Sequence, residues 1–527
     1  MEKNKASHWA DQTAEKIIQT WGDKDIYTCA SGITPSGTVH VGNFREMISV
    51  ELVVRALRDR GKKVRFIYSW DDYDVFRKVP LNMPQAELLE KFLRQPITLV
   101  PDPWERDSSY ARHHEVDVES ILPEVGIAPE FLYQAERYRK GMYAQGMRRA
   151  LEMREQLKTI LDKYRDEDHK IQGEWWPVSV FCSACNRDTT EIEGWDGEWG
   201  LSYRCDCGHR ETGDLRSLKG AKLVWRVDWP MRWDFEQVDF EPAGKDHHSQ
   251  GGSFDTSKHV VEEVYGRKPP VTFRYDFIGI KGSPGKMSSS KGTVVDLPDL
   301  LRVYQPELVR YLFAGTRPNT EFVISFDLDV IKIYEDYDRT ERIYWGKEKA
   351  KDQATEAKER RIYELSQVGP VPSEEPYQVP FRHLCSLLLI HQGDVEAVME
   401  ALPGLKDSQK PKVRSRAERA WYWINECSPE DFRFSVRKPG EKARLSDAET
   451  EALRRLRDEV VLRLESFGNE KSIAEAIYAA AGAAGVDSKT LFRAAYQALI
   501  GKDQGPRLAG FLGTLGKEKV LGILAAY

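Results

Sequence analysis

The pattern of apolar positions in the first seventy residues predicts a strand, a helix and a second strand, in that order. Residues 26–30 form an apolar run, residues 44–60 repeat apolar side chains at helical spacing, and residues 64–70 form a second apolar run. Two parallel strands need a crossover of this kind, so the pattern indicates a Rossmann-type α/β unit. A helix is predicted before it over residues 7–20, with Ser7 as its N-cap.

The segment between the first strand and the helix has the composition of a phosphate-binding loop. Residues 28–43 read T-C-A-S-G-I-T-P-S-G-T-V-H-V-G-N. Glycines permit close approach of a ligand, N–H groups at a helix N-terminus favour phosphate, and His40 adds a side-chain donor. A second small-residue loop, G-K-M-S-S-S-K-G at residues 285–292, carries two lysines. We expect the two segments to close on one ATP.

The remaining pattern divides the chain of 527 residues into further parts. Residues 1–83 and 222–330 are predicted to be the two halves of the catalytic Rossmann domain, and residues 84–221 an insertion between them. Residues 331–527 have helical periodicity almost throughout, and begin with one long charged helix predicted over residues 331–366. The predicted fold class is therefore α/β, with a Rossmann-type parallel-sheet catalytic domain, an insertion containing a zinc ribbon, and an all-α C-terminal domain.

Four of the seven cysteines lie together within the insertion, in the ribbon predicted for residues 175–215. C-S-A-C is followed, after 19 residues, by C-D-C-G-H. Two close-spaced pairs across a hairpin are typical of a structural Zn²⁺ site. Cys182, Cys185 and Cys205 are predicted ligands, and either Cys207 or His209 supplies the fourth. The alternative is a ribbon of free thiols without a metal.

Charge and hydropathy limit the expected cellular location and the expected partners of the protein. The net charge of −6 excludes a globally basic nucleic-acid coat but leaves room for a local basic face. Residues 1–11 have no signal-peptide pattern, and no apolar run is long enough to span a membrane. We expect a cytoplasmic protein without membrane contact, a monomer with no obligate protein partner.

The helical region carries aromatic residues between two basic runs. The basic runs fall within residues 406–419 and 433–444, and Trp421, Tyr422 and Trp423 lie between them. Phosphate contacts combined with stacking surfaces favour single-stranded RNA as a ligand. The alternative is a solvated helix face with aromatic side chains in the core.

Two motifs in this order carry a family resemblance. P-S-G-T-V-H-V-G-N followed by K-M-S-S-S-K-G resembles the two signature sequences of class I aminoacyl-tRNA synthetases. H-W-A-D, W-R-V-D-W-P-M-R-W, G-K-D-H and G-P-R-L-A-G-F-L are similar to class I lysyl-tRNA synthetases, and the match spans nearly the whole chain. The resemblance implies that ATP with Mg²⁺ activates L-lysine to lysyl-adenylate. The lysyl group then passes to the terminal adenosine of tRNA-Lys, whose anticodon the helical domain binds.

The signature motifs supply the predicted catalytic and ATP-binding residues. The catalytic candidates are His40, Lys286 and Lys291. The ATP-binding candidates are Pro35, Gly37, His40, Gly42, Asn43, Gly244, Asp246, Lys286, Ser288 and Lys291. Asn43 stands where the family pattern has a second histidine, and Ser289 where it has a second lysine, so Lys291 is the nearest substitute.

The amino-acid substrate is argued from charge. Related glutamyl enzymes place an arginine shortly before this loop to hold a carboxylate, whereas residues 31–34 here contain none. A pocket for an ammonium group needs acceptors, carboxylates and an aromatic wall for the aliphatic stem. The predicted lysine-binding residues are Gly32, Thr34, Asp72, Trp225 and His247. The alternative for Asp72 and its neighbouring aspartates is an exposed turn.

A P-D-P turn marks a second possible metal site, which some relatives carry. Here Asp102 and His113 persist, but Arg106 and Asp107 occupy the other two ligand positions. We predict no metal at this turn.

Three rival functions remain open at this level. The first is a glutamyl or glutaminyl enzyme of the same class, which the missing arginine disfavours. The second is a small-ligand nucleotidyltransferase, which needs neither the ribbon nor a helical domain of this length. The third is an RNA-binding paralogue without activity, which the presence of His40, Lys286 and Lys291 disfavours.

Overall fold

The computed structural model describes residues 8–81, 83–282 and 294–527, and Lys286, Ser288, Ser289 and Lys291 lie outside them. The chain forms two compact units. The first comprises Met1–Leu301, Pro306–Ile324 and Thr340–Val371. The second comprises Arg302–Gln305, Ser325–Arg339 and Pro372–Tyr527.

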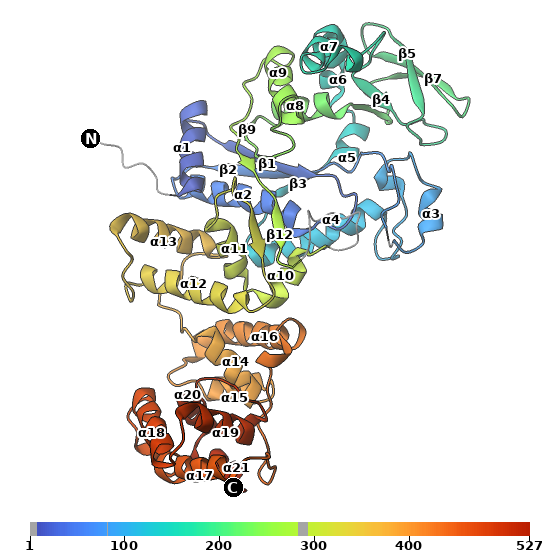
Figure 1. Cartoon of the computed structure of the whole chain (residues 1–527). Coiled ribbons are helices and arrows are strands. Elements are labelled where there is room, and N and C mark those ends of the chain that lie inside the picture. Colours follow the sequence, from blue (N-terminus) through green and yellow to red (C-terminus); the bar gives the residue numbers. More distant parts are fainter. Residues whose placement is uncertain (1–7, 82, 283–293) are drawn as a thin grey trace. The chain divides into compact units, whose positions relative to one another are not determined.

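A four-stranded parallel sheet lies at the centre of the first unit (Figure 1). Its strands run in the order β3 (Glu130–Tyr133), β2 (Val64–Trp70), β1 (Tyr27–Ile33) and β9 (Val238–Phe240). The predicted strand–helix–strand unit is confirmed, with β1 and β2 in parallel register from Tyr27↔Val64 to Ile33↔Trp70. Strand β3 falls inside the predicted insertion and was not predicted, because four residues are too short to show a period.

Helices cover both faces of this sheet. Helix α2 (Val41–Arg58) packs on β1 and β2, with α1 (Trp9–Trp21) beside it. On the other face, α8 (Trp225–Phe235) and α9 (Ser253–Glu263) bury apolar side chains against the strands. The N-cap of α1 is His8, whose Nδ1 accepts from the Ala10 N–H at 3.2 Å, and not Ser7, which lies outside the described residues.

The described part of the segment between β2 and α8 carries five α-helices and two small antiparallel sheets. The helices are α3 (Ala86–Glu90), α4 (Tyr110–Ile121), α5 (Gln134–Arg139), α6 (Ala144–Glu152) and α7 (Arg154–Asp162). The ribbon sheet consists of β5 (Thr190–Trp195), β6 (Gly200–Cys205) and β7 (Arg210–Asp214). Before and after it, β4 (Val178–Val180) pairs with β8 (Ala221–Leu223), so the chain enters and leaves the ribbon through one strand pair.

The prediction of one long helix over residues 331–366 is wrong. Two helices occupy this region, α12 (Asp329–Tyr344) and α13 (Gln353–Ser366). Gly346 follows α12 at φ 71°, a left-handed conformation that glycine adopts without strain. Asp352 then caps α13 by accepting from the Thr355 N–H at 2.7 Å.

Short strands and helices complete the first unit, and the last residues of α10 belong to the second. They are β10 (Ala243–Gly244), β11 (Arg274–Tyr275), β12 (Ile278–Ile280), β13 (Phe322–Ile324), α10 (Leu297–Val303) and α11 (Pro306–Ala314). Within the described ranges, no helix is long and apolar enough to cross a membrane.

The second unit is helical, as predicted for the C-terminal region. Its helices are α14 (Phe381–Ile390), α15 (Val395–Glu400), α16 (Lys410–Glu426), α17 (Asp447–Arg455), α18 (Glu470–Ala483), α19 (Ser488–Ile500), α20 (Leu508–Leu515) and α21 (Lys517–Leu524). Trp423 is fully buried and donates to the Phe326 carbonyl at 2.8 Å. Arg416 is also buried and binds both carboxylate oxygens of Asp338, at 2.8 and 2.6 Å. Part of the basic and aromatic segment at residues 406–444 is therefore buried in the core of the second unit.

Candidate active site

His40 caps the helix that follows the first strand. Its Nδ1 accepts from the Gly42 N–H at 3.1 Å, and its carbonyl accepts from the N–H groups of Asn43 and Phe44 at 2.9 and 3.1 Å. Because Nδ1 accepts, a neutral imidazole carries its proton on Nε2, which makes that atom the donor of the ring. The start of α2 thus combines a helix N-terminus with a ring N–H, a combination suited to phosphate.

One pocket gathers most of the predicted ATP-binding residues that the structure describes. Its lining includes His40, Gly42, Asn43, Gly244 and Asp246. His247, Tyr275, Asp276, Phe277 and Ile278 complete the lining. Pro35 and Gly37 belong to the same loop but are not among the lining residues.

The start of α2 also contacts the chain shortly after the second predicted loop. The Val41 N–H donates to the Val295 carbonyl at 2.8 Å, and His40 forms a β-bridge with Asp296. These contacts tie the start of α2 to residues three and four positions after the predicted loop at 285–292. Lys286, Ser288 and Lys291 themselves lie outside the described residues, so their roles stay predictions.

A second pocket lies at the carboxyl ends of β1 and β2 and shares His247 with the first. Three of the predicted lysine-binding residues line it, namely Gly32, Trp225 and His247. Thr34 and Asp72 do not: the Thr34 hydroxyl donates to Asp74 at 2.8 Å, and Asp72 is buried and accepts from the Ala135 N–H at 2.8 Å. Of the three aspartates in the D-D-Y-D turn, only Asp71 therefore lines this pocket.

Close strand contact and stacked indoles shape this pocket. A Cβ at Gly32 would lie 2.8 Å from the Ser69 carbonyl oxygen, so only glycine fits between the two strands. Trp225 stacks on Trp229 with ring centroids 5.1 Å apart and an interplanar angle of 15°. Trp225 is 37% exposed, whereas Trp229 and Trp233 are buried. Trp225 is thus the indole of the three that a ligand reaches from solvent.

Sequence reasoning missed the charges that distinguish this pocket. Two of its acidic residues are paired with arginine: Asp71 lies 2.7 Å from Arg232, and Glu236 lies 2.8 Å from Arg65. The other two, Glu46 and Glu241, have no arginine or lysine ion-pair partner among the described residues. The signal available in the sequence was a carboxylate in an apolar stretch, M-I-S-V after Glu46 and V-D-F before Glu241.

Neutral donors hold both of these carboxylates. Glu46 accepts from the Ser31 hydroxyl at 2.8 Å, the Gly32 N–H at 3.2 Å and the Tyr275 hydroxyl. Glu241 accepts from the indole N–H groups of Trp229 and Trp233, at 3.0 and 2.6 Å.

The two carboxyl groups give the pocket an electrostatic preference. Burial raises the pKa of Glu46, and burial together with the charge of Glu46 raises the pKa of Glu241 to about 7. A cation placed beside the pair relieves both effects, so the pocket favours an ammonium group over a carboxylate.

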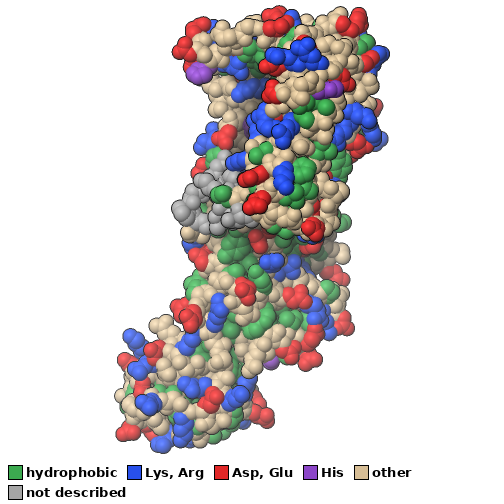
Figure 2. All heavy atoms as spheres, turned by 90° about the vertical axis from the view of Figure 1, so that its right-hand side faces the viewer, with side chains coloured by type: hydrophobic (Ala, Val, Ile, Leu, Met, Phe, Trp, Pro, Cys, Tyr) green, Lys and Arg blue, Asp and Glu red, His purple; other side chains and the backbone are tan. Residues whose placement is uncertain are grey.

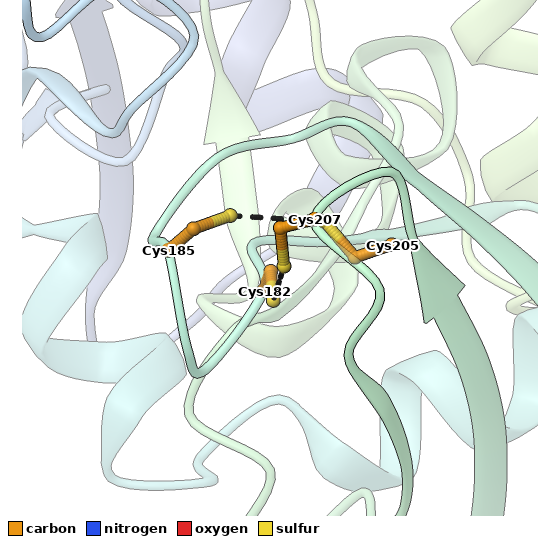
Figure 3. Close-up of side chains that lie close together, drawn as sticks. All are labelled: Cys182, Cys185, Cys205 and Cys207. Carbon is orange, nitrogen blue, oxygen red and sulfur yellow. Dashed lines mark hydrogen bonds between the residues drawn. The ribbon is translucent and has the colours of Figure 1, made fainter.

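The four cysteines form a compact cluster in the ribbon (Figure 3). Cys182 and Cys207 have their sulfur atoms 3.7 Å apart, and so have Cys185 and Cys205. All four sulfur atoms lie within 4.8 Å of one another. A tetrahedral zinc with bonds of about 2.3 Å sets its sulfur ligands roughly 3.8 Å apart, so the cluster fits zinc. His209 instead contacts the Ser183 hydroxyl at 3.0 Å.

The P-D-P turn also brings possible ligand atoms together. Asp102, Asp107 and His113 each place one such atom within 4.8 Å of the others. The Arg106 guanidinium contacts the His113 ring at 3.3 Å and Asp117 at 2.6 Å, so the cluster already contains a cation. The absence of a metal here stays a prediction.

Sheet topology and site together define a class of protein: an α/β protein of Rossmann type with a candidate nucleotide pocket at the carboxyl edge of a parallel sheet. Residues 7–369 match the family model for tRNA synthetases class I (K), and the chain belongs to this family. It is 56% identical to the lysine–tRNA ligase of Treponema pallidum, over 99% of both chains. It is 43% identical to the lysine–tRNA ligase of Thermococcus kodakarensis, over 98% of both chains.

Proposed function

We propose that this protein is a lysine–tRNA ligase. The observation that carries the proposal is the pocket with two carboxylates, Glu46 and Glu241, beside the ATP pocket formed at His40. Lysine is the amino-acid substrate whose side chain ends in an ammonium group. The glutamyl and glutaminyl alternatives would place a carboxylate or an amide against two acidic side chains, half-buried Glu46 and buried Glu241.

The proposed reaction has two steps. The lysine carboxylate attacks the α-phosphorus of ATP, and pyrophosphate leaves; Mg²⁺ carried by ATP would offset part of the charge of the phosphates. A hydroxyl of the terminal tRNA-Lys ribose then attacks the lysyl carbonyl, and AMP leaves. Adenylyl transfer depends mainly on positioning and charge neutralisation, so the protein groups act as donors and cations rather than as nucleophiles.

Each pocket has a defined part in this proposal. At the ATP pocket, His40 Nε2–H and the first N–H groups of α2 donate to the phosphates, and Lys286 and Lys291 neutralise the leaving pyrophosphate. At the amino-acid pocket, Glu46 and Glu241 accept from the ammonium groups of lysine. Trp225 covers the aliphatic stem, and His247 lines both pockets, where the two substrates meet.

Transfer of the lysyl group also requires contact with tRNA. On the face drawn in Figure 2, Lys and Arg side chains are interspersed with Asp and Glu side chains. Binding on this face would therefore rest on local basic groups rather than on one basic field. We assign anticodon binding to the helical second unit.

Lysine-dependent ATP–pyrophosphate exchange tests the proposed function. We expect exchange with lysine. Exchange with glutamate or glutamine should be lower by at least about 100-fold, because neither side chain supplies a cation to pair with Glu46 and Glu241 in the pocket. Lysylation of tRNA by the same preparation separates an active ligase from an RNA-binding paralogue. Exchange with glutamate but not with lysine would reject the assignment.

The four cysteines are proposed to hold one structural zinc ion, with Cys207 as the fourth ligand. Metal analysis should give one zinc per chain, and Cys185→Ser should lower both the zinc content and Tm, because an incomplete site cannot hold the ribbon closed. Cys427→Ser is the matched control, since Cys427 lies outside the cluster. Two zinc ions per chain would show that the P-D-P turn also binds metal.

A further inference from the structure

A lysine at the ribbon exit reaches the acidic turn of the catalytic sheet. Lys222 lies on β8, and its Nζ donates to Asp74 Oδ1 at 2.8 Å and to the Tyr73 carbonyl at 2.9 Å. Its side chain is 13% exposed, and that of Asp74 is 41% exposed. A lysine rarely buries its charge unless a partner compensates, so this pair marks a specific contact.

Asp74 holds the substrate loop with its other oxygen. The Thr34 hydroxyl donates to Asp74 Oδ2 at 2.8 Å. Thr34 is the first residue after β1, between Gly32, which lines the amino-acid pocket, and His40, which lines the ATP pocket. A chain of contacts therefore runs from Lys222 through Asp74 to the loop that connects a lining residue of one pocket to a lining residue of the other.

The surrounding charges keep Lys222 protonated. Burial alone would lower the pKa of Lys222, but Asp74, Asp228 and Asp71 face it and together raise the pKa. Burial likewise opposes the charge on Asp74, and Lys222 and Thr34 outweigh it, so the pKa of Asp74 is lowered. Both shifts favour the charged form of the partner concerned, so the pair is ionic at neutral pH.

The ribbon fixes the strand that carries Lys222. Ser179 on β4 pairs with Lys222 on β8, and the Phe181 N–H donates to the Gly220 carbonyl at 2.9 Å. Cys182, the first cysteine of the cluster, directly follows Phe181. The closed ribbon and the lysine therefore share one strand pair.

We propose that Lys222 is a positioning residue for lysine activation: through Asp74 it fixes Thr34 and, with it, the loop that carries Gly32 to the amino-acid pocket and His40 to the ATP pocket. The proposal rests on the function proposed above. Lys222 and Thr34 act here without touching either substrate, which explains why Thr34 lies outside the lining of both pockets. The proposal also means that Lys222, a residue supporting the lysine site, lies on β8, the strand by which the chain leaves the ribbon.

Lys222→Met is the direct test, measured as lysine-dependent exchange. We expect KM for lysine to rise about 10- to 100-fold, the loss typical of one hydrogen bond between charged groups. Lys219→Met makes the same change at an exposed position of the same ribbon exit and should leave KM unchanged. Lys222→Arg keeps the charge and should recover part of the loss.

A double-mutant cycle separates positioning from general stability. Thr34→Val and Lys222→Met act through the same carboxylate, so their combined effect on KM should be smaller than the product of the two single effects. A residue that only stabilises the fold would lower Tm and active fraction in both variants, while KM stayed normal. A normal KM in Lys222→Met, or fully multiplicative effects, would overturn the proposal. A wild-type protein inactive with lysine would instead reject the proposed function.

Discussion

Glu46→Gln is expected to reduce kcat/KM for lysine-dependent exchange by about 100-fold or more, mainly through a higher KM for lysine. The amide keeps the size of the side chain and one acceptor oxygen, but it removes the charge opposite the substrate ammonium. Truncating one partner of a buried charged pair typically costs about 2–5 kcal/mol. Exchange at several lysine concentrations measures the effect, with Tm measured alongside it because Glu46 also accepts hydrogen bonds from Ser31, Gly32 and Tyr275.

Glu236→Gln is the matched control for this prediction. It removes the same charge from a residue of the same pocket, but Glu236 already binds Arg65 and Arg137. We expect this variant to lower stability and to change KM for lysine far less than Glu46→Gln does. Equal effects of the two variants on KM would mean that lysine binding depends only on the total charge of the pocket. Glu46 would then have no specific contact with lysine.

The parts that were predictable from the sequence depend on signals within a few residues of each other. The strand, loop and helix around His40 follow from hydrophobic period and glycine placement, and the cysteine cluster follows from two short spacings. In both cases the chain neighbours that create the pattern also create the site.

The parts that were not predictable depend on partners far away in the chain. The aspartates of the D-D-Y-D turn look alike in the sequence, yet Asp71 binds Arg232, Asp72 caps the start of α5, and Asp74 joins Thr34 to Lys222. Each partner lies between 40 and 161 residues away. Only the folded sheet edge decides which carboxylate faces the substrate.

Burial likewise decides which aromatic side chains of the second unit are available to a ligand. Trp421, Tyr422 and Trp423 form one run in the sequence, but Trp423 binds a carbonyl 97 residues away and is fully buried. Consecutive helical residues point in different directions, so a run of aromatic side chains cannot all face one ligand.

His40→Ala is expected to reduce kcat for exchange about 100-fold, with a smaller change in KM for lysine. The variant removes the Nε2–H donor, and the loss of one such donor to transition-state charge costs about 3 kcal/mol. It also removes the cap on the Gly42 N–H, which alone costs about 1 kcal/mol of stability. His40→Asp separates the two effects, because aspartate restores the cap acceptor and cannot donate to phosphate when ionised. We expect His40→Asp to recover Tm but not kcat. Normal lysylation of tRNA by His40→Ala would contradict the catalytic assignment of this residue.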